Sequence, residues 1–167
     1  MGLTYEQISL GFEKSKIVKT RYDRLVSGDL TITMQLSKGQ NPTACARRFS
    51  YVSKCEGENK AIIFVGDNFE ASESPCWFFD SNYSYLNNPT ITQIIFAGPR
   101  CKDQYLRALM AGVSPDKIKT TSDSKAGTDL LDTTLSKDIY VLYGPYMVKE
   151  ANLTKNKLIA LGSGGDL

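Results

Sequence analysis

"KAIIFVGD" (residues 60–67) and "ITQIIFAG" (residues 91–98) are the two stretches that decide the fold of this chain. Neither alternates apolar with polar residues, as a strand with one solvent-exposed face does. Continuous apolar runs of this length are typical of strands buried on both faces, and "DIYVLYG" at 138–144 is a third such run. The pattern predicts the centre of a parallel sheet.

Stretches with helical signals separate these strands. The stretch that begins "NPT" offers Asn41 as helix N-cap and Pro42 at the first helical position, and Gly112 is placed to close a later helix. Alternation of buried strands and helices predicts an α/β fold, a Rossmann-like three-layer sandwich with a mainly parallel sheet. The predicted helices cover residues 41–55, 100–112, 124–135 and 147–161, and residues 116–121 are predicted to be extended.

The N-terminal part adds a helix and a β-hairpin to this sandwich. Thr4 and Gln7 have capping-box spacing at the start of a short helix, and residues 21–37 alternate on both sides of "SGD" as a hairpin does. We expect residues 1–17 to be a helix that continues from a preceding domain. Residues 18–160 are then the α/β domain, and residues 161–167 a flexible tail.

The composition excludes several classes of function. Lys and Arg number 20 against 18 Asp and Glu, and they are scattered, so nucleic-acid binding is not predicted. Histidine is absent, so a Ser-His-Asp or Cys-His arrangement cannot be completed within this chain. Cys45, Cys55, Cys76 and Cys101 form no CxxC pair, which favours buried free thiols over a metal site. Without a run that could span a membrane or a signal peptide, a cytoplasmic location is expected.

Ligands of parallel sheets bind where the strands end, and two loops there offer groups for an anion. The loop before Asn41 and Pro42 presents backbone N–H groups at a helix start, which suit a phosphate or a carboxylate. A plain helix cap is the alternative. Arg100 in "AGPR" has a guanidinium that would clamp an anion, and the alternative is a solvated basic side chain.

The loop between residues 66 and 80 offers acids and aromatic side chains. Asp67 ends a buried strand and Asp80 closes "SPCWFFD", so either acid could bind Mg²⁺ or orient a base, or serve only the local structure. If this stretch is extended, Trp77, Phe78 and Phe79 cannot all face one core, because adjacent side chains alternate. Large aromatic side chains in a loop are favoured interface anchors, and a loop folded down by its own aromatics is the alternative.

Four stretches, in this order, resemble the C-terminal domain of the MurT-type Mur ligases. "LTYEQISLGFEK" resembles the helix that ends the family's central domain, and "QNPT" resembles its K-N-P-A loop with Gln40 in place of Lys. "GDN…CWFFD" resembles N-D-N…S-W-x-x-D, and "IIFAGPR…LRALMAGV" resembles I-I-x-x-G-x-R…L-R-L-K-x-A-x-V. The matching residues are Asn41, Pro42, Asp67, Asn68, Trp77, Asp80, Gly98, Arg100, Leu106 and Arg107.

The resemblance implies a place in an ATP-dependent ligase of cell-wall synthesis. In the family, this subunit amidates the D-glutamate of the lipid II stem peptide with ammonia from a separate glutaminase of the class I amidotransferase type. ATP and Mg²⁺ would be held by the central domain, which this chain lacks, so no cofactor and no ligase activity are expected of the chain alone. The nucleotide and substrate cleft would include Asn41, Pro42, Asp67, Asn68, Asp80 and Arg100, and the partner interface Trp77 and Phe78.

One position departs from the family pattern. The family carries an Asp three residues before the Trp, thought to complete the glutaminase's Cys-His-Asp triad, and Ser74 stands there, with Glu73 beside it. A serine cannot stabilise an imidazolium as a carboxylate does. Two other functions stay open: a non-catalytic interaction module, in which the missing Asp would reflect lost amidation chemistry, and an autonomous small-ligand-binding Rossmann-like domain.

Overall fold

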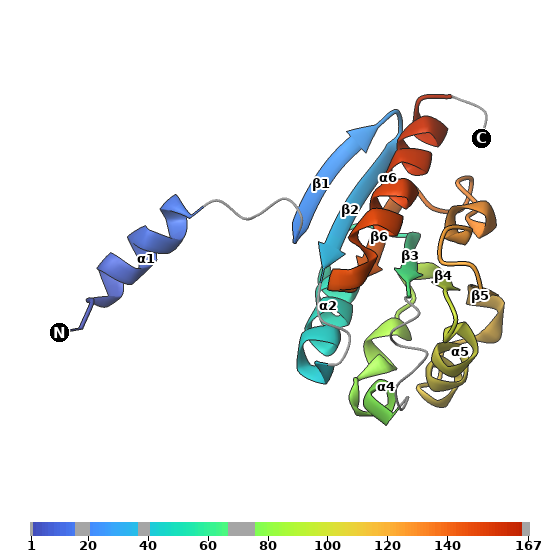
Figure 1. Ribbon diagram of the computed structural model, residues 1–167, viewed down its shortest axis with the longest axis horizontal. Helices are drawn as coiled ribbons and strands as arrows, with labels where there is room; N and C mark the ends of the chain where they lie inside the picture. Colours follow the sequence, from blue (N-terminus) through green and yellow to red (C-terminus); the bar gives the residue numbers. More distant parts are fainter. Residues whose placement is uncertain (1, 16–20, 37–40, 67–75, 165–167) are drawn as a thin grey trace.

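A computed structural model describes residues 2–15, 21–36, 41–66 and 76–164. Its centre is a six-stranded sheet with the strand order β1-β2-β6-β3-β4-β5 (Figure 1). The first two strands form the predicted antiparallel hairpin, and every other neighbouring pair is parallel. The strands are β1 Tyr22–Ser27, β2 Leu30–Leu36, β3 Lys60–Val65, β4 Ile91–Ala97, β5 Ile118–Thr121 and β6 Asp138–Tyr143.

The two stretches that decide the fold lie at the centre of this sheet, as predicted. All residues of β3 are buried, and β3 lies between β4 and β6. Successive side chains of a strand point to opposite faces, so Ile62 and Phe64 enter one hydrophobic cluster while Ile63 and Val65 enter another. Both faces of the sheet therefore need apolar residues, which explains the continuous runs.

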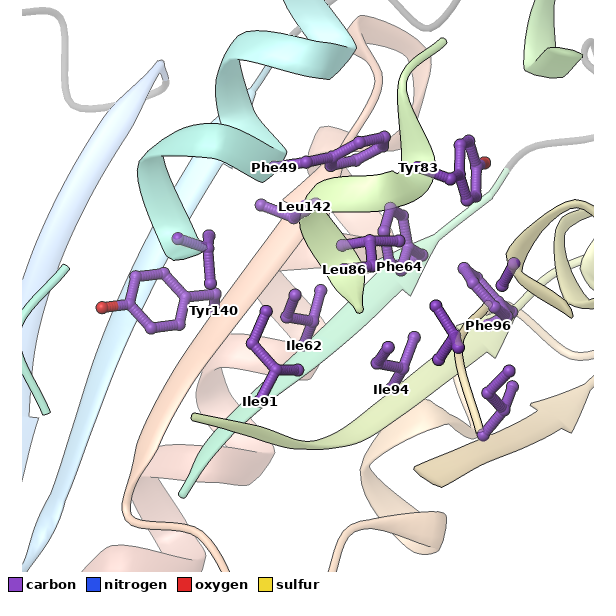
Figure 2. Packing of buried hydrophobic residues seen from close by; sticks show 14 of the residues in the cluster. Phe49, Ile62, Phe64, Tyr83, Leu86, Ile91, Ile94, Phe96, Tyr140 and Leu142 are labelled. Carbon is purple, nitrogen blue, oxygen red and sulfur yellow. The ribbon is translucent and has the colours of Figure 1, made fainter. Parts of the chain in front are cut away.

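Helices and 3₁₀ turns cover both faces and make the three layers. On one face, Phe49, Tyr83 and Leu86 pack over strand residues such as Phe64 and Leu142 (Figure 2). On the other face, α6 lies across β2 and β6. The helices are α1 Tyr5–Lys14, α2 Pro42–Lys54, α4 Cys76–Asp80, α5 Cys101–Met110 and α6 Val148–Gly162, and the 3₁₀ turns are η1 Tyr83–Leu86, η2 Pro115–Lys117, η3 Gly127–Leu130 and η4 Pro145–Met147.

The predicted helix at 124–135 is wrong, because only the short turn η3 forms there. A Cβ atom at Gly127 would lie 2.8 Å from Cγ2 of Ile63, so the chain passes close to the sheet at this point. The carboxylate of Asp132 accepts bonds from the backbone N–H and the hydroxyl of Thr134, at 2.8 and 2.6 Å. Such local side-chain bonds compete with helical ones and favour a turn.

The N-terminal helix α1 has the predicted capping box. The hydroxyl of Thr4 accepts from the backbone N–H of Gln7 at 3.3 Å, and the Gln7 side chain accepts from the N–H of Thr4 at 2.9 Å. No residue of α1 is buried, and Figure 1 draws it away from the sheet. The domain boundary near residue 17 stays a prediction, and residues 165–167 of the predicted tail lie outside the described residues. Within the described ranges, no helix is long and apolar enough to cross a membrane.

Candidate functional site

The course of the chain at the carboxyl ends of the strands indicates where a ligand site can form. After β2, β3 and β4 the chain passes to α2, α4 and α5 on one face, whereas after β6 it passes to α6 on the other. Strand β6 lies between β2 and β3. The loops therefore diverge at the carboxyl end of β6, and open α/β sheets bind ligands at such points.

A cavity of about 30 Å³ lies at this point. Gly66 and Gly144, the residues that follow β3 and β6, contribute to its lining, and Arg48 enters it from α2. Phe49, Phe64 and Phe78 form apolar walls, and Cys45, Val65, Ser81, Tyr83, Gln104, Leu142 and Tyr143 complete the lining. The cavity thus combines a cation with aromatic surfaces.

Arg48 is held by the ends of two strands. Its Nη1 donates to the carbonyls of Gln35 in β2 and Tyr143 in β6, each at 3.3 Å, and its Nη2 lies 3.6 Å from Sγ of Cys45. The Nε atom is buried and has no hydrogen-bond partner among the described residues. Burial, reinforced by the charge of Asp23, raises the pKa of the Tyr143 phenol, and the charge of Arg48 opposes that rise.

A second arginine contacts Ser81 and Tyr83, two residues that line the cavity. Nη2 of Arg107 in α5 donates to the carbonyl of Ser81 at 3.0 Å, and its guanidinium carbon lies 5.2 Å from the centre of the Tyr83 ring. A cation over an aromatic ring is attracted by the ring's quadrupole. Arg107, one of the residues that carry the family resemblance, therefore holds the segment from α4 to η1 against α5.

Asn41 and Pro42 have the structural roles that the sequence predicts for a helix start. The side chain of Asn41 accepts a hydrogen bond from the N–H of Ala44 at 3.0 Å, and Pro42 is the first residue of α2. The side-chain oxygen of Asn41 therefore serves to cap the helix. Any contribution of this helix start to a ligand site rests on its location at the carboxyl end of β2.

Arg100 and Asp80 lie at the ends of helices on the same face. Nη1 of Arg100, just before α5, forms an ion pair with Oδ2 of Asp103 at 3.1 Å, with a quarter of the arginine side chain exposed. Asp80 is exposed at the end of α4, which contacts α5. Asp67, Asn68, Glu73 and Ser74 lie outside the described residues, so their predicted roles stay predictions.

The stretch "CWFFD" is a helix and not extended, which changes the argument about its aromatic residues. Phe78 is only 1% exposed and belongs to the core cluster that also holds Phe49 and Phe64. The prediction that Phe78 anchors a partner is therefore wrong for this conformation, because a buried ring offers no surface. Phe79 is 43% exposed and offers an aromatic surface on this helix. Trp77 lies in the same helix.

Two functional candidates, Arg48 and a larger polar hollow, were not predicted. Arg48 stands three residues after Cys45 and four before Val52, on the buried side of α2, and a charged residue in this periodicity is the signal that would have found it. A hollow of about 310 Å³ lies where β5 ends and α6 begins, lined by Ser122, Asp123, Ser124, Lys125, Met147 and Glu150. The described residues contain no group of three or more His, Cys, Asp or Glu side chains arranged to hold a metal.

Comparison with known proteins identifies the domain. A family model described as "MurT ligase C-terminal" matches residues 38–145. The chain is 22% identical over 142 residues to "Lipid II isoglutaminyl synthase (glutamine-hydrolyzing) subunit MurT" of Streptococcus pneumoniae, a match that covers 85% of this chain and 31% of that protein.

Solved structures support the fold assignment. Two crystal structures of MurF from Acinetobacter baumannii match 92% of this chain, with TM-scores of 0.62 and 0.58 and identities of 16% and 18%. The matched part is 33% and 34% of those chains, so this chain spans about a third of the length of its relatives. The predicted α/β, Rossmann-like architecture is confirmed, and the chain belongs to the MurT ligase C-terminal family.

Proposed function

We propose that this domain is the C-terminal module of an ATP-dependent amidoligase that converts the D-glutamate of the lipid II stem peptide to its amide. The observation that carries the proposal is the family match over residues 38–145. That range contains α2, β3, α4, β4 and α5, and with them Arg48, Asp80, Arg100 and Arg107. The streptococcal relative is subunit MurT of a glutamine-hydrolyzing lipid II isoglutaminyl synthase, and this name supplies the reaction class.

The domain's own contribution in this proposal is to complete a cleft and not to hold the nucleotide. The sequence contains no GxxxxGK[ST] motif, and the described residues offer no cluster of metal ligands. The described residues therefore do not fit an ATP–Mg²⁺ site of their own, and we assign no step through such a site to them. Arg100 is the candidate for contact with an anionic group, since a guanidinium binds phosphate or carboxylate oxygens in pairs.

A glutaminase is proposed as the source of ammonia. The chain has no histidine, so it cannot itself form the Cys-His pair that glutamine hydrolysis of this type requires. The activation of the acceptor carboxylate and the release of ammonia would then take place on different subunits. Ser74 stands at the position of the family's triad Asp, and Glu73, directly before it, is the neighbouring residue that would supply a carboxylate instead.

The test is reconstitution of the protein that carries this domain with a glutaminase of the same organism. Lipid II, ATP and glutamine are supplied, ADP release is followed, and the product is examined by mass spectrometry for replacement of a carboxyl by an amide. Amide formed only when ATP, glutamine and both proteins are present supports the proposal. ATP turnover without amidation, or amidation of another acceptor, would contradict it.

A non-catalytic interaction module is the second candidate, and exposed apolar side chains on α4 and α5 favour it. Phe79, Leu106 and Met110 are 43%, 52% and 65% exposed, and the two helices contact each other. Apolar side chains gathered at a surface are typical of protein–protein contacts. Calorimetry that finds tight glutaminase binding by a protein without ligase activity would favour this candidate over the first.

A further inference from the structure

We propose that Arg107 is a positioning residue, which sets the place of the Asp80 carboxylate relative to Arg100 at the edge of the proposed ligase cleft. The inference rests on the proposed function, since it concerns the residues through which this domain would complete that cleft. Asp80 is exposed and directly precedes Ser81, a residue that lines the cavity at the carboxyl ends of the strands. An acid at this edge of an α/β sheet lies where ligands of the fold class bind.

The backbone beside Asp80 is held by a hydrogen bond from Arg107. Nη2 of Arg107 donates to the carbonyl of Ser81 at 3.0 Å. Ser81 is 1% exposed, so little water is available to replace the donor, and the loss of a charged donor to a buried carbonyl is costly. Because Ser81 follows Asp80 directly, a shift of this carbonyl also moves the end of α4 and the carboxylate that it carries.

A second contact of the same guanidinium holds the chain just after Ser81. The guanidinium carbon of Arg107 lies 5.2 Å from the centre of the Tyr83 ring, in the range of a cation–π interaction. Tyr83 is 2% exposed and meets Phe49 edge to face, with the ring centres 5.1 Å apart (Figure 2). The turn that follows Asp80 is therefore attached to the core, and Arg107 joins this turn to α5 at two points.

Helix α5 also has Arg100 at its start, so it links the two charged candidates of the cleft. Arg100 is the N-cap residue of α5, and Arg107 follows it by about two turns. This spacing places the two backbone positions on the same side of the helix, about 10 Å apart along its axis. Helix α4, which ends with Asp80, contacts α5. Arg107 thus determines how far the Asp80 carboxylate lies from Arg100.

The chemistry of the guanidinium explains why an arginine stands at position 107. A guanidinium is planar and carries five N–H donors, so it can donate to a carbonyl and interact with an aromatic ring at the same time. None of the ion pairs found among the described residues includes Arg107. Its charge therefore acts on the segment that carries Asp80, and not on an acidic side chain elsewhere.

The first measurement is a double-mutant cycle in the protein that carries this domain, with amide formation in the reconstituted system as the readout. R107M keeps an unbranched side chain but removes the charge and the donors, and D80N removes the charge of Asp80. Each variant should lower kcat by about tenfold or more, and R107M should lower it no further once D80N is present. Multiplied losses in the double variant, or full activity of D80N, would overturn the proposal.

The second measurement needs no ligase reaction and is made on the present chain. Residual dipolar couplings of the backbone N–H bonds report the orientation of α4 relative to the sheet. R107M should change the couplings of α4 and leave those of β3 as they are. Leu158→Ala is the control for a general loss of stability, because Leu158 is buried against the other face of the sheet. It should lower the thermal midpoint without a change in the couplings of α4.

Further variants keep the outcome decisive. If R107M does not fold, Arg107→Lys retains a cation but loses the planar fork, and the same cycle is run with it. Arg24→Met is the control for the lost charge, since Arg24 is exposed on β1, and it should behave as the unchanged protein does. Unchanged couplings of α4 in R107M would overturn the proposal. Changed couplings, in a protein that forms no amide, would support the positioning of Asp80 and contradict the proposed function alone.

Discussion

The backbone of Gly98 lies against that of Gly66, so closely that a Cβ atom at Gly98 would stand 2.8 Å from the carbonyl oxygen of Gly66. The N–H of Gly66 donates to the carbonyl of Ala97 at 2.7 Å, and the hydroxyl of Ser124 donates to the carbonyl of Gly66. Loops that follow three different strands are thus joined at one residue. The join fixes the edge of the sheet between the cavity and Arg100.

Replacement of Gly98 by alanine should destabilise the domain. Gly98 has φ +136°, which side chains rarely adopt, and the new Cβ would meet backbone atoms that cannot move aside. Strain of this kind costs about 2 kcal/mol or more in the free energy of unfolding. The control is Gly11→Ala, since nothing lies within 4 Å of a Cβ there. Urea denaturation that gives both variants the same midpoint would show that the close contact is absent.

The two phenylalanines of α4 should respond differently to truncation. Phe78→Ala removes a ring that is 1% exposed and should lower the free energy of unfolding by about 3–4 kcal/mol. Phe79→Ala removes a ring that is 43% exposed and should lower it by less than about 1 kcal/mol. Denaturant unfolding of both variants measures the difference. Similar losses would mean that both rings pack inside, and the assignment of Phe79 to the surface would then be wrong.

The strands were predictable from the sequence because burial on both faces leaves a continuous apolar run. Helix α2 was predictable for a different reason, since Asn41 and Pro42 carry local capping signals that do not depend on the tertiary structure. The segment after β5 lacks such a signal. Its course is decided by the packing of Gly127 against Ile63, a contact between residues far apart in the chain, which the sequence pattern does not contain.

The candidate site was predicted in its location but only partly in its residues. The edge of the sheet follows from strand direction, and Arg100 and Asp80 follow from their positions after strands and aromatic residues. Arg48 was missed, because its contacts depend on the tertiary structure. Carbonyl groups at the ends of β2 and β6, which are far apart in the sequence, both accept hydrogen bonds from its guanidinium. Phe78 was placed at an interface, because a five-residue helix has too few residues to reveal its period.

The Asp132 turn gives a prediction about pH. The hydroxyl of Thr134, followed by its backbone N–H, holds the pKa of the Asp132 carboxyl below its usual value. A lowered pKa in the folded state means that the contribution to stability is present above the unfolded value of about 3.9 and is lost as the pH falls through the folded value. Thr134→Val removes the hydroxyl and should move the Asp132 titration, followed by ¹³C NMR, toward the ordinary value.

Thr133→Val is the matched control for this titration. Thr133 is the neighbouring threonine, and no hydrogen bond from its side chain to Asp132 is present in the structure. Its replacement should leave the Asp132 titration in place. An equal displacement in the two variants would assign the effect to the valine side chain and not to the lost hydroxyl.

Arg100→Ala should separate the ligase step from the stability of the domain, within the function proposed above. Arg100 forms a partly exposed ion pair with Asp103 at the start of α5, and ion pairs at a protein surface contribute at most about 1 kcal/mol, so the variant should fold. If Arg100 contacts an anionic group in the cleft, its loss should lower amide formation in the reconstituted system by about tenfold or more.

The control for that experiment is Arg24→Ala, because Arg24 is exposed on the edge strand β1 and the overall charge changes equally. Asp103→Asn adds a second comparison, since it breaks the ion pair but keeps the guanidinium. A direct role of Arg100 requires that Arg100→Ala is slow while Arg24→Ala and Asp103→Asn remain active. Equal losses in Arg100→Ala and Asp103→Asn would instead assign the effect to the ion pair, so that Arg100 would act through the position of α5.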